Sequence, residues 1–260
     1  MLINCETPLL TTPGVALPAS PSVACATKTC VILQPSYIPW RGYFDQILKS
    51  DIFVFYDDVQ YDKHGWRNRN RIKTQQGSQW LTIPVSAKGN ITRSRNIKDI
   101  PIVYDKDWVN LHLEKLKSNY SRTPYYHEYM ELLLPFYKRH YELLADFTID
   151  TTIALASKFG VSKDRFIRSS ELGIEADRNQ RLIDILRHLN CGHYITGPSA
   201  QDYIERQLYA DAGIRLSFIN YDYPEYPQLN PPFDPQVSIL DLLFMMGDES
   251  LKYMTGSLTS

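Results

Sequence analysis

The sequence predicts an α/β protein built on a doubly wound, mainly parallel sheet, with a β-hairpin and a helical insertion. Three observations lead to this prediction. Short apolar, β-branched runs alternate with an amphipathic helical pattern near the start of the chain. The same alternation returns after residue 165. Between the two regions lie a hairpin signal and a long stretch with helical spacing of apolar residues.

The first region predicts a strand–helix–strand unit. Residues 30–33 and 52–56 are short apolar runs typical of buried strands, and residues 41–49 between them carry apolar side chains at helical spacing. Two strands joined by a helix of this length form a right-handed crossover and lie parallel. We therefore expect these strands to be neighbours in the sheet.

The middle region predicts a hairpin followed by helices. Residues 69–74 and 80–85 are expected to pair around the polar gap 75–78, because its glycine favours a turn. Apolar spacing then predicts the helical insertion, about residues 105–160, with helices at 106–119, 127–145 and 150–159.

The last region resumes the alternation, so its strands are expected beside the first unit. A loop rich in Pro and Tyr, 221–235, leads to a final helix at 238–246. The other expected elements are strands at 166–168, 194–197 and 214–219 and helices at 179–189 and 200–212.

Composition narrows the class of protein. We expect one domain at 29–260 after a flexible leader at 1–28, whose prolines and missing basic start argue against a secretion signal. A net charge of -1 argues against a broad surface for nucleic acid, and no apolar run reaches about 18 residues, so we expect no membrane span and a cytoplasmic protein. The four cysteines form no C-x-x-C pair, which predicts neither a disulfide framework nor a metal site. The sequence names no cofactor and leaves the oligomeric state open.

The loop after the first strand is a candidate ligand site. It contains Gln34, Tyr37, Gly42 and Tyr43 and opens directly into a helix. Ligands of open α/β sheets bind at the carboxyl ends of strands, where helix N-termini favour anions, and Gly42 would allow close approach. The alternative is a rigid, proline-stiffened turn whose aromatic side chains pack on the core.

Asp57 and Asp58 end the second strand and are expected on the same rim of the sheet as Gln34. Adjacent carboxylates either bind a metal with substrate phosphates, or supply a base if burial raises a pKa, or serve only as solvated strand caps. Asp58 is the catalytic candidate of the pair.

Residues 63–73 are the most unusual segment. An extended chain would place Arg67, Arg69, Arg71 and Lys73 on one face, with Asn70 on the other. Four cations on one face repel one another unless an anion joins them, and arginine binds phosphate or carboxylate through paired N–H groups. We favour anion binding, with Trp66 and Asn70 as further substrate contacts, over an edge strand that uses charge against aggregation.

Proton transfer at neutral pH favours histidine. His64, with its neighbour Lys63, lies inside the cationic segment, and His112 lies four residues after Trp108 on one face of a predicted helix. All three are candidate catalytic residues, and a buried structural role is the alternative for His112.

A second loop between strand and helix contains Gly197 and Ser199, with Tyr203 one turn further along. It is either a second phosphate- or sugar-binding turn or a helix start capped by Ser199. No nucleophile signature surrounds Ser199 or any cysteine, so covalent acyl-enzyme chemistry has no support in the sequence.

The order of these motifs resembles the WbqC-like protein family over roughly residues 31–247. The resemblance implies a place in cell-surface polysaccharide (O-antigen) or specialised-metabolite biosynthesis, with glycyl or acyl transfer suggested, and it adds Gln60 to the candidate binding residues. Residues 40–43 also look like the HIGH motif of nucleotidylyltransferases, although both histidines of that motif are absent. The matching motifs are Gln34-Pro35-x-Tyr37-x-Pro39-x-x-Gly42-Tyr43-Phe44, Asp51-x-Phe53-Val54, Asp58-x-Gln60-Tyr61-x-Lys63-x-x-Trp66-x-Asn68-Arg69-Asn70, Trp80-Leu81-Thr82-Ile83-Pro84-Val85, the single residues Trp108, His112, Tyr120, Gly197 and Tyr203, and Ser238-Ile239-Leu240-Asp241-Leu242-Leu243.

Three functions are compatible with the sequence. The first is a transferase acting on an amino group of a phosphate-bearing sugar or metabolite, in which the arginines hold the anion and His64 or Asp58 accepts the proton. The second is an ATP-using nucleotidyltransferase or ligase with a HIGH-like loop. The third is a non-catalytic module that binds nucleic acid or a sugar phosphate through the same cations.

Overall fold

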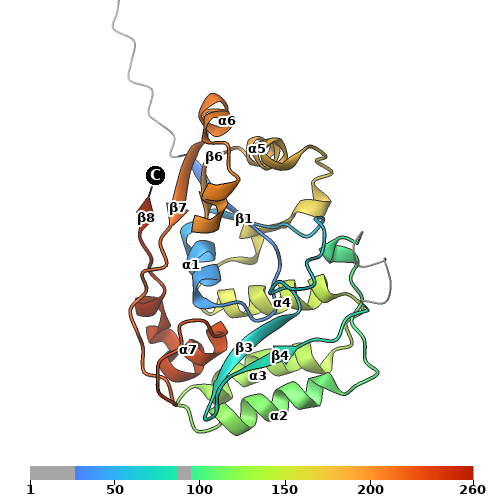
Figure 1. Ribbon diagram of the computed structural model, residues 1–260, viewed down its shortest axis with the longest axis vertical. Helices are drawn as coiled ribbons and strands as arrows, with labels where there is room; N and C mark the ends of the chain where they lie inside the picture. Colours follow the sequence, from blue (N-terminus) through green and yellow to red (C-terminus); the bar gives the residue numbers. More distant parts are fainter. Residues whose placement is uncertain (1–26, 87–94, 260) are drawn as a thin grey trace, which may run out of the picture.

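The computed structural model describes residues 27–86 and 95–259. Figure 1 shows a sheet region, which contains the first and last described residues, and a helical region beside it. Most of the expected leader, 1–28, lies outside the described residues, and Lys28 is already the first residue of a strand. No helix in the described ranges is long and apolar enough to cross a membrane.

The six-stranded sheet has the order β5-β2-β1-β6-β7-β8. Its first five strands are parallel, and β8 runs antiparallel to β7. The expected parallel pairing of the first two strands is confirmed, as is the position of the later strands beside them. The strands are β1 (Lys28–Leu33), β2 (Ile52–Phe55), β5 (Phe166–Arg168), β6 (Cys191–Thr196), β7 (Arg215–Ile219) and β8 (Leu258–Thr259).

Helices cover both faces of the sheet, which confirms the doubly wound architecture. Alternate residues of β1 belong to different cores: Val31 packs with α1 (Arg41–Lys49), whereas Cys30 and Ile32 pack with α5 (Arg178–His188). This alternation follows from the two-residue period of a strand. Helix α6 (Arg206–Asp211) covers the same face as α5.

The hairpin consists of β3 (Arg69–Thr74) and β4 (Gly77–Thr82) and forms a sheet of its own. In Figure 1 it lies against the helical segment. The second strand was expected at 80–85 but begins three residues earlier. Gly77 adopts a φ of +100° and pairs directly with Thr74, so the turn needs only residues 75–76.

The helical segment confirms the expected insertion but corrects two boundaries: the helix expected at 127–145 is shorter, and the helix expected at 150–159 begins six residues earlier, at Leu144. Its helices are α2 (Trp108–Tyr120), α3 (Tyr126–Lys138) and α4 (Leu144–Ser157). The predicted helix 127–145 ends seven residues early, because the chain leaves α3 at Arg139 in an extended conformation. Leu143 then bridges to Pro101, and the Glu142 carbonyl accepts a hydrogen bond from Ile102, so tertiary pairing overrides helical periodicity.

The expected helix 200–212 is divided in two. A 3-10 helix spans Pro198–Asp202, and α6 begins only at Arg206. Ser199 therefore lies inside the first turn, and Gly197 precedes that turn without a side-chain cap. The final helix, α7 (Ile239–Met246), follows the prediction, and the Ser238 hydroxyl caps it by accepting from the Leu240 amide.

Candidate functional site

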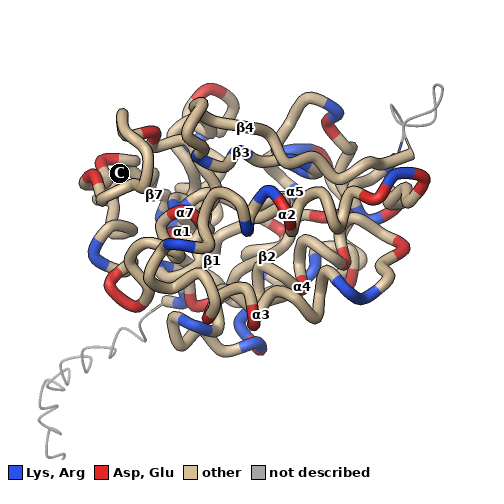
Figure 2. Tube along the Cα trace, turned by 90° about the horizontal axis from the view of Figure 1, so that it is seen from below, with Lys and Arg blue, Asp and Glu red and all other residues tan. Residues whose placement is uncertain are grey.

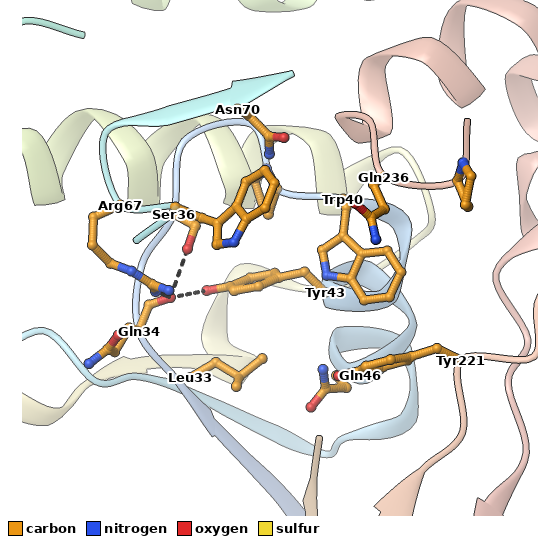
Figure 3. Close-up of a pocket in the computed structure, with 13 residues that line it drawn as sticks. Leu33, Gln34, Ser36, Trp40, Tyr43, Gln46, Arg67, Asn70, Tyr221 and Gln236 are labelled. Carbon is orange, nitrogen blue, oxygen red and sulfur yellow. Dashed lines mark hydrogen bonds between the residues drawn. The ribbon is translucent and has the colours of Figure 1, made fainter. Parts of the chain in front are cut away.

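A pocket lies at the carboxyl end of β1, where the chain connections diverge. The chain passes from β1 to β2 on one side, while β6 occupies the other side. Ligands of open α/β sheets bind at this switch point. The cavity measures about 550 Å³, within the range of roughly 300–1,000 Å³ typical of small-molecule pockets. Figure 3 shows its walls, which comprise Leu33, Gln34, Ser36, Pro39, Trp40, Tyr43, Gln46, Trp66, Arg67, Asn70, Tyr221, Pro235 and Gln236.

The hairpin is fixed over the first loop by hydrogen bonds of buried groups. The Asn70 amide donates to the carbonyls of Tyr37 (3.2 Å) and Ile38 (2.8 Å), and the Tyr37 amide donates to the Arg67 carbonyl (3.0 Å). Asn70 is 2% exposed, so both bonds are sheltered from water. The arginine-bearing strand thus lies at the mouth of the first strand–loop–helix unit.

Arg67 carries a positive charge at the wall of this pocket. Its Nη1 donates to the carbonyls of Gln34 (3.1 Å) and Pro35 (3.4 Å), while its buried Nε has no hydrogen-bond partner. Burial lowers the pKa of Arg67, and the nearby Tyr43 and Asp62 oppose that change. No carboxylate lies within ion-pair distance of it in the described part of the chain.

The other cations of the row are also held by uncharged oxygen atoms. Arg69 donates to the carbonyls of His64 (2.6 Å) and Gly65 (3.3 Å), and Arg71 donates to the backbone and side-chain oxygens of Gln236. Lys73 donates to the Pro232 carbonyl at 2.5 Å. The expected alternation holds up to Ile72, since Asn68, Asn70 and Ile72 are buried and Arg67, Arg69 and Arg71 are partly exposed, whereas Lys73 is itself buried. Of the four cations, only Arg67 lines the pocket.

The start of α1 differs from the open turn that the sequence suggested. The space beside Gly42 is filled by the Trp40 indole, three atoms of which would lie 2.4–2.8 Å from an added Cβ. Gly42 therefore allows approach of a side chain rather than of a ligand. Arg41 is buried and donates to the carbonyls of Pro224 (2.7 Å) and Tyr253 (3.2 Å), so it does not face the pocket.

The remaining polar wall consists of an amide and two phenols. Gln46 is 2% exposed, its Nε2 donates to the Gly42 carbonyl (3.2 Å), and its Oε1 has no partner. Burial raises the pKa of Tyr221 to about 12, and a hydrogen bond with Gln46 opposes this rise. The Tyr43 hydroxyl donates to the Gln34 carbonyl (3.2 Å), and burial raises its pKa well above the ordinary value. In Figure 3 Gln46 and Arg67 lie on opposite sides of the Tyr43 ring.

The two adjacent aspartates do not join this pocket. Asp57 is fully buried and accepts bonds from Arg168 (2.7 Å) and from Ser169 and Ser170, and Asp58 pairs with Arg181 and Ser169. The prediction that Asp58 would share a pocket with Gln34 and the arginines is therefore wrong. Both lie on the expected rim, but Asp57 is held by the end of β5 and the two serines after it, and Asp58 is held mainly by α5.

Three candidates near the hairpin lie outside the pocket wall. His64 and Lys63 are exposed, and the backbone of His64 donates to Asp62 and accepts from Arg69. Gln60 is exposed and forms an isolated bridge with Asn96. The pocket wall does not contain these three residues.

Tyr37 and His112 belong to the core. The Tyr37 hydroxyl lies 2.8 Å from His112 Nδ1 and 2.6 Å from the Tyr137 hydroxyl, and Tyr37 is fully buried. Burial lowers the pKa of His112 to about 4, with Lys115 acting in the same direction and a bond to the Thr82 backbone opposing it. This geometry agrees with the structural role that was the alternative for His112. It does not agree with the expectation that Tyr37 contacts a ligand.

The second loop lies near the pocket without lining it. A Cβ on Gly197 would lie 2.7 Å from the hydroxyl of Tyr221, which is part of the wall. Ser199 is exposed, and Tyr203 is 61% exposed. The expected capping role of Ser199 is absent, as the position of the 3-10 helix shows.

Among the wall residues that sequence reasoning missed, Gln46, Tyr221 and Gln236 are polar and lie outside the first loop. Gln46 follows Tyr43 by three positions, which places both on one helical face, so its spacing could have indicated it. Tyr221 follows the last parallel strand directly, a position expected at the ligand edge. No local signal marks Gln236, which reaches the pocket only through the path of the C-terminal loop.

The wall offers one cation, one unpartnered carbonyl oxygen and several aromatic rings. Such a surface can bind an anion joined to a ring, and it can orient a hydrogen-bond donor. No carboxylate and no imidazole is part of the wall. No cluster of three or more His, Cys, Asp or Glu suited to a metal occurs within 27–86 and 95–259.

The fold and the pocket define a doubly wound α/β protein with a partly cationic cavity at the carboxyl end of its central strand. The chain belongs to the WbqC-like protein family, whose model matches residues 34–253. It is 38% identical over 229 residues to Uncharacterized protein Rv1507c of Mycobacterium tuberculosis (strain ATCC 25618 / H37Rv), an alignment covering 87% of this chain and 97% of that protein. No solved structure matches the chain significantly.

Proposed function

We propose that this protein is a cytoplasmic group-transfer enzyme that binds a phosphate-bearing small molecule in the pocket through Arg67. The proposed reaction transfers a glycyl or other acyl group to an amino group of a sugar or metabolite, in cell-surface polysaccharide or specialised-metabolite biosynthesis. The observation that supports it is the charge on Arg67, which is desolvated and has no carboxylate partner among the described residues. Burial of an unpaired charge is unfavourable, and a bound anion would offset it.

In acyl transfer the amine nitrogen attacks the acyl carbon, a C–N bond forms, the bond to the leaving group breaks, and the nitrogen releases a proton. His64 and Asp58 were expected to accept that proton, but neither is part of the pocket wall. We therefore assign the pocket the task of holding both reactants in a productive orientation, an effect that contributes several kcal/mol to intramolecular reactions.

Binding of inorganic pyrophosphate, measured by titration calorimetry, tests the anion site. A charge-assisted hydrogen bond contributes roughly 1.5–3 kcal/mol, so Arg67→Met should weaken binding about 10- to 150-fold. Arg67→Lys should retain part of the affinity, because it keeps the charge but loses the paired donors. Arg187→Met, at an exposed position of α5, is the matched control and should bind normally. Equal affinity of the Arg67→Met and control variants would contradict the proposal.

The reaction itself is tested by mass spectrometry. The protein is incubated with nucleotide-linked amino sugars and with glycyl or acetyl donors, and the expected result is a mass gain of one acyl group on the amino sugar. That gain should disappear in the Arg67→Met variant. Absence of a mass gain with every donor–acceptor pair would count against acyl transfer.

The two other functions have less support from the geometry. In the HIGH-like segment Arg41 is bound to carbonyls of the C-terminal region rather than facing the pocket, which weakens the nucleotidyltransferase alternative. Detection of pyrophosphate exchange into ATP would support the nucleotidyltransferase alternative. Basic and acidic positions are interspersed along the chain in Figure 2, in contrast to the broad basic face expected of a nucleic-acid-binding module.

A further inference from the structure

Two tryptophans lie side by side on the outside of the hairpin region. Trp66 is 40% exposed and Trp80 is 42% exposed, and their ring centroids are 5.1 Å apart. Two large aromatic rings in contact with each other and with solvent are unusual, because burial of such rings contributes strongly to stability. Trp66 also lines the pocket, so this surface is continuous with the cavity.

Two arginines make the same surface cationic. The Arg69 guanidinium carbon lies 4.6 Å from the Trp80 ring centroid, and that of Arg71 lies 5.8 Å from the centroids of both tryptophans. Neither arginine forms an ion pair within the described ranges, and their hydrogen bonds go to carbonyl and amide oxygens. We call Trp66, Trp80, Arg69 and Arg71 the Trp–Arg platform.

We propose that the Trp–Arg platform is a second ligand subsite, which stacks a ring attached to the phosphate group held by Arg67. This inference rests on the proposed function, since it takes the Arg67 anion site as its starting point. The ring is either the base of a nucleotide or the sugar of a sugar phosphate, and both present a face that stacks on indole. Arg67 and Trp66 line the same cavity, so a ring joined to an anion at Arg67 can extend along this wall towards the platform.

The charge of the platform favours a ligand of this class over a neutral one. A ring that carries phosphate brings negative charge towards Arg69 and Arg71, neither of which forms an ion pair in the described part of the chain, although Asp234 lies near enough to Arg71 for the pKa of Asp234 to be lowered. The arginines rest on the indoles, which keeps their guanidinium planes ordered before a ligand arrives. If Trp80 served only to hold β4 in place, its replacement would lower the stability of the protein. It would not change which ligands the protein binds.

The test compares three probes by titration calorimetry: inorganic pyrophosphate, UDP and glucose 1-phosphate. Pyrophosphate reports the anion site alone, UDP adds a ribose and a base, and glucose 1-phosphate carries a sugar ring without a base. Stacking on an aromatic side chain predicts that Trp80→Ala weakens the ring-bearing ligand roughly 5- to 150-fold and leaves pyrophosphate unchanged. Loss with UDP but not with glucose 1-phosphate identifies a base, and loss with glucose 1-phosphate identifies a sugar.

Two further variants make the result decisive. Trp80→Phe keeps an aromatic face and should retain most of the ring-dependent affinity. This result would show that the loss in Trp80→Ala comes from the missing ring and not from unfolding. Leu111→Ala, at a site that is 53% exposed on α2, is the control for loss of an exposed apolar side chain.

Unchanged binding of both ring ligands by Trp80→Ala overturns this inference, as does an equal loss for all three probes. In either case, if pyrophosphate binding still depends on Arg67, the proposed anion site is supported and only the platform is rejected. Failure of all three probes to bind the unmodified protein overturns the anion site and the platform together.

Discussion

Replacing Asp57 with Asn should destabilise the protein strongly without changing its ligand affinity. Asp57 lies two residues after β2, is fully buried, and accepts hydrogen bonds from Arg168, the last residue of β5, and from Ser170, with the Ser169 hydroxyl also in reach. An asparagine keeps only one acceptor oxygen, and its NH₂ group would face donors. At the Oδ2 position these donors are Arg168 Nε (2.7 Å) and the Ser170 hydroxyl (3.0 Å).

The size of the effect follows from burial. Removing one partner of a buried ion pair typically costs about 3–5 kcal/mol. We expect about 3 kcal/mol here, because Arg168 keeps its second carboxylate partner, Asp146, at 2.7 Å. For a chain of this size about 3 kcal/mol lowers the melting temperature by roughly 6–12 °C.

Asp146→Asn provides a control on the same arginine. The Asp146 side chain is 40% exposed, and exposed ion pairs contribute about 0–1 kcal/mol. Urea denaturation and calorimetry measure the stability of both variants. Pyrophosphate titration of the folded proteins then shows whether the carboxylate has a structural or a ligand-binding role. Equal destabilisation by the two substitutions would refute the argument from burial. Loss of pyrophosphate affinity in a folded Asp57→Asn protein would refute the structural assignment.

Two further predictions concern the core and the pocket wall. Burial holds the pKa of His112 at about 4 in the folded state, below the ordinary 6.5, so the unfolded chain binds more protons and stability falls as the pH drops from about 6.5 to about 4. The decrease approaches about 3 kcal/mol, and urea midpoints across this pH range should show a shallower decrease for His112→Gln; equal slopes would contradict the prediction. Gly42→Ala should displace the Trp40 indole, lower stability by about 1–3 kcal/mol and weaken pyrophosphate binding. A normal melting temperature with normal affinity would show that Trp40 moves freely.

The sequence was sufficient for the parallel strands and for the position of the later strands beside the first unit, but it did not predict β8. Residues 30–33 and 52–56 are short, apolar and bounded by polar residues, so local pattern and secondary structure agree. Boundaries failed where distant segments decide the backbone. Leu143 leaves the helical pattern because it bridges to Pro101, a partner that no local periodicity can indicate.

The candidate site was predictable for those wall residues that lie within a single short segment of the sequence. Gln34, Tyr43, Trp66, Arg67 and Asn70 were predicted as binding candidates, and all five line the pocket.

The errors have a common physical cause. A position on the rim of a sheet does not specify which neighbouring element a side chain meets, and Asp58 meets Arg181 of α5 instead of the pocket. Tyr37 was misassigned because its hydroxyl lies within the core beside His112. The contributions of Tyr221 and Gln236 depend on a loop that returns to β1 from nearly two hundred positions away.

The location of β1 at the centre of the sheet constrains how this protein is made. The ribosome synthesises β1 early, yet its neighbour β6 emerges much later; Thr29 and His193, which meet across the two strands, are 164 residues apart. Until then one hydrogen-bonding edge of a very apolar strand stays open in the nascent chain, where it can pair with other polypeptides. We therefore expect yields during overproduction to depend on slow synthesis, low temperature or available chaperones.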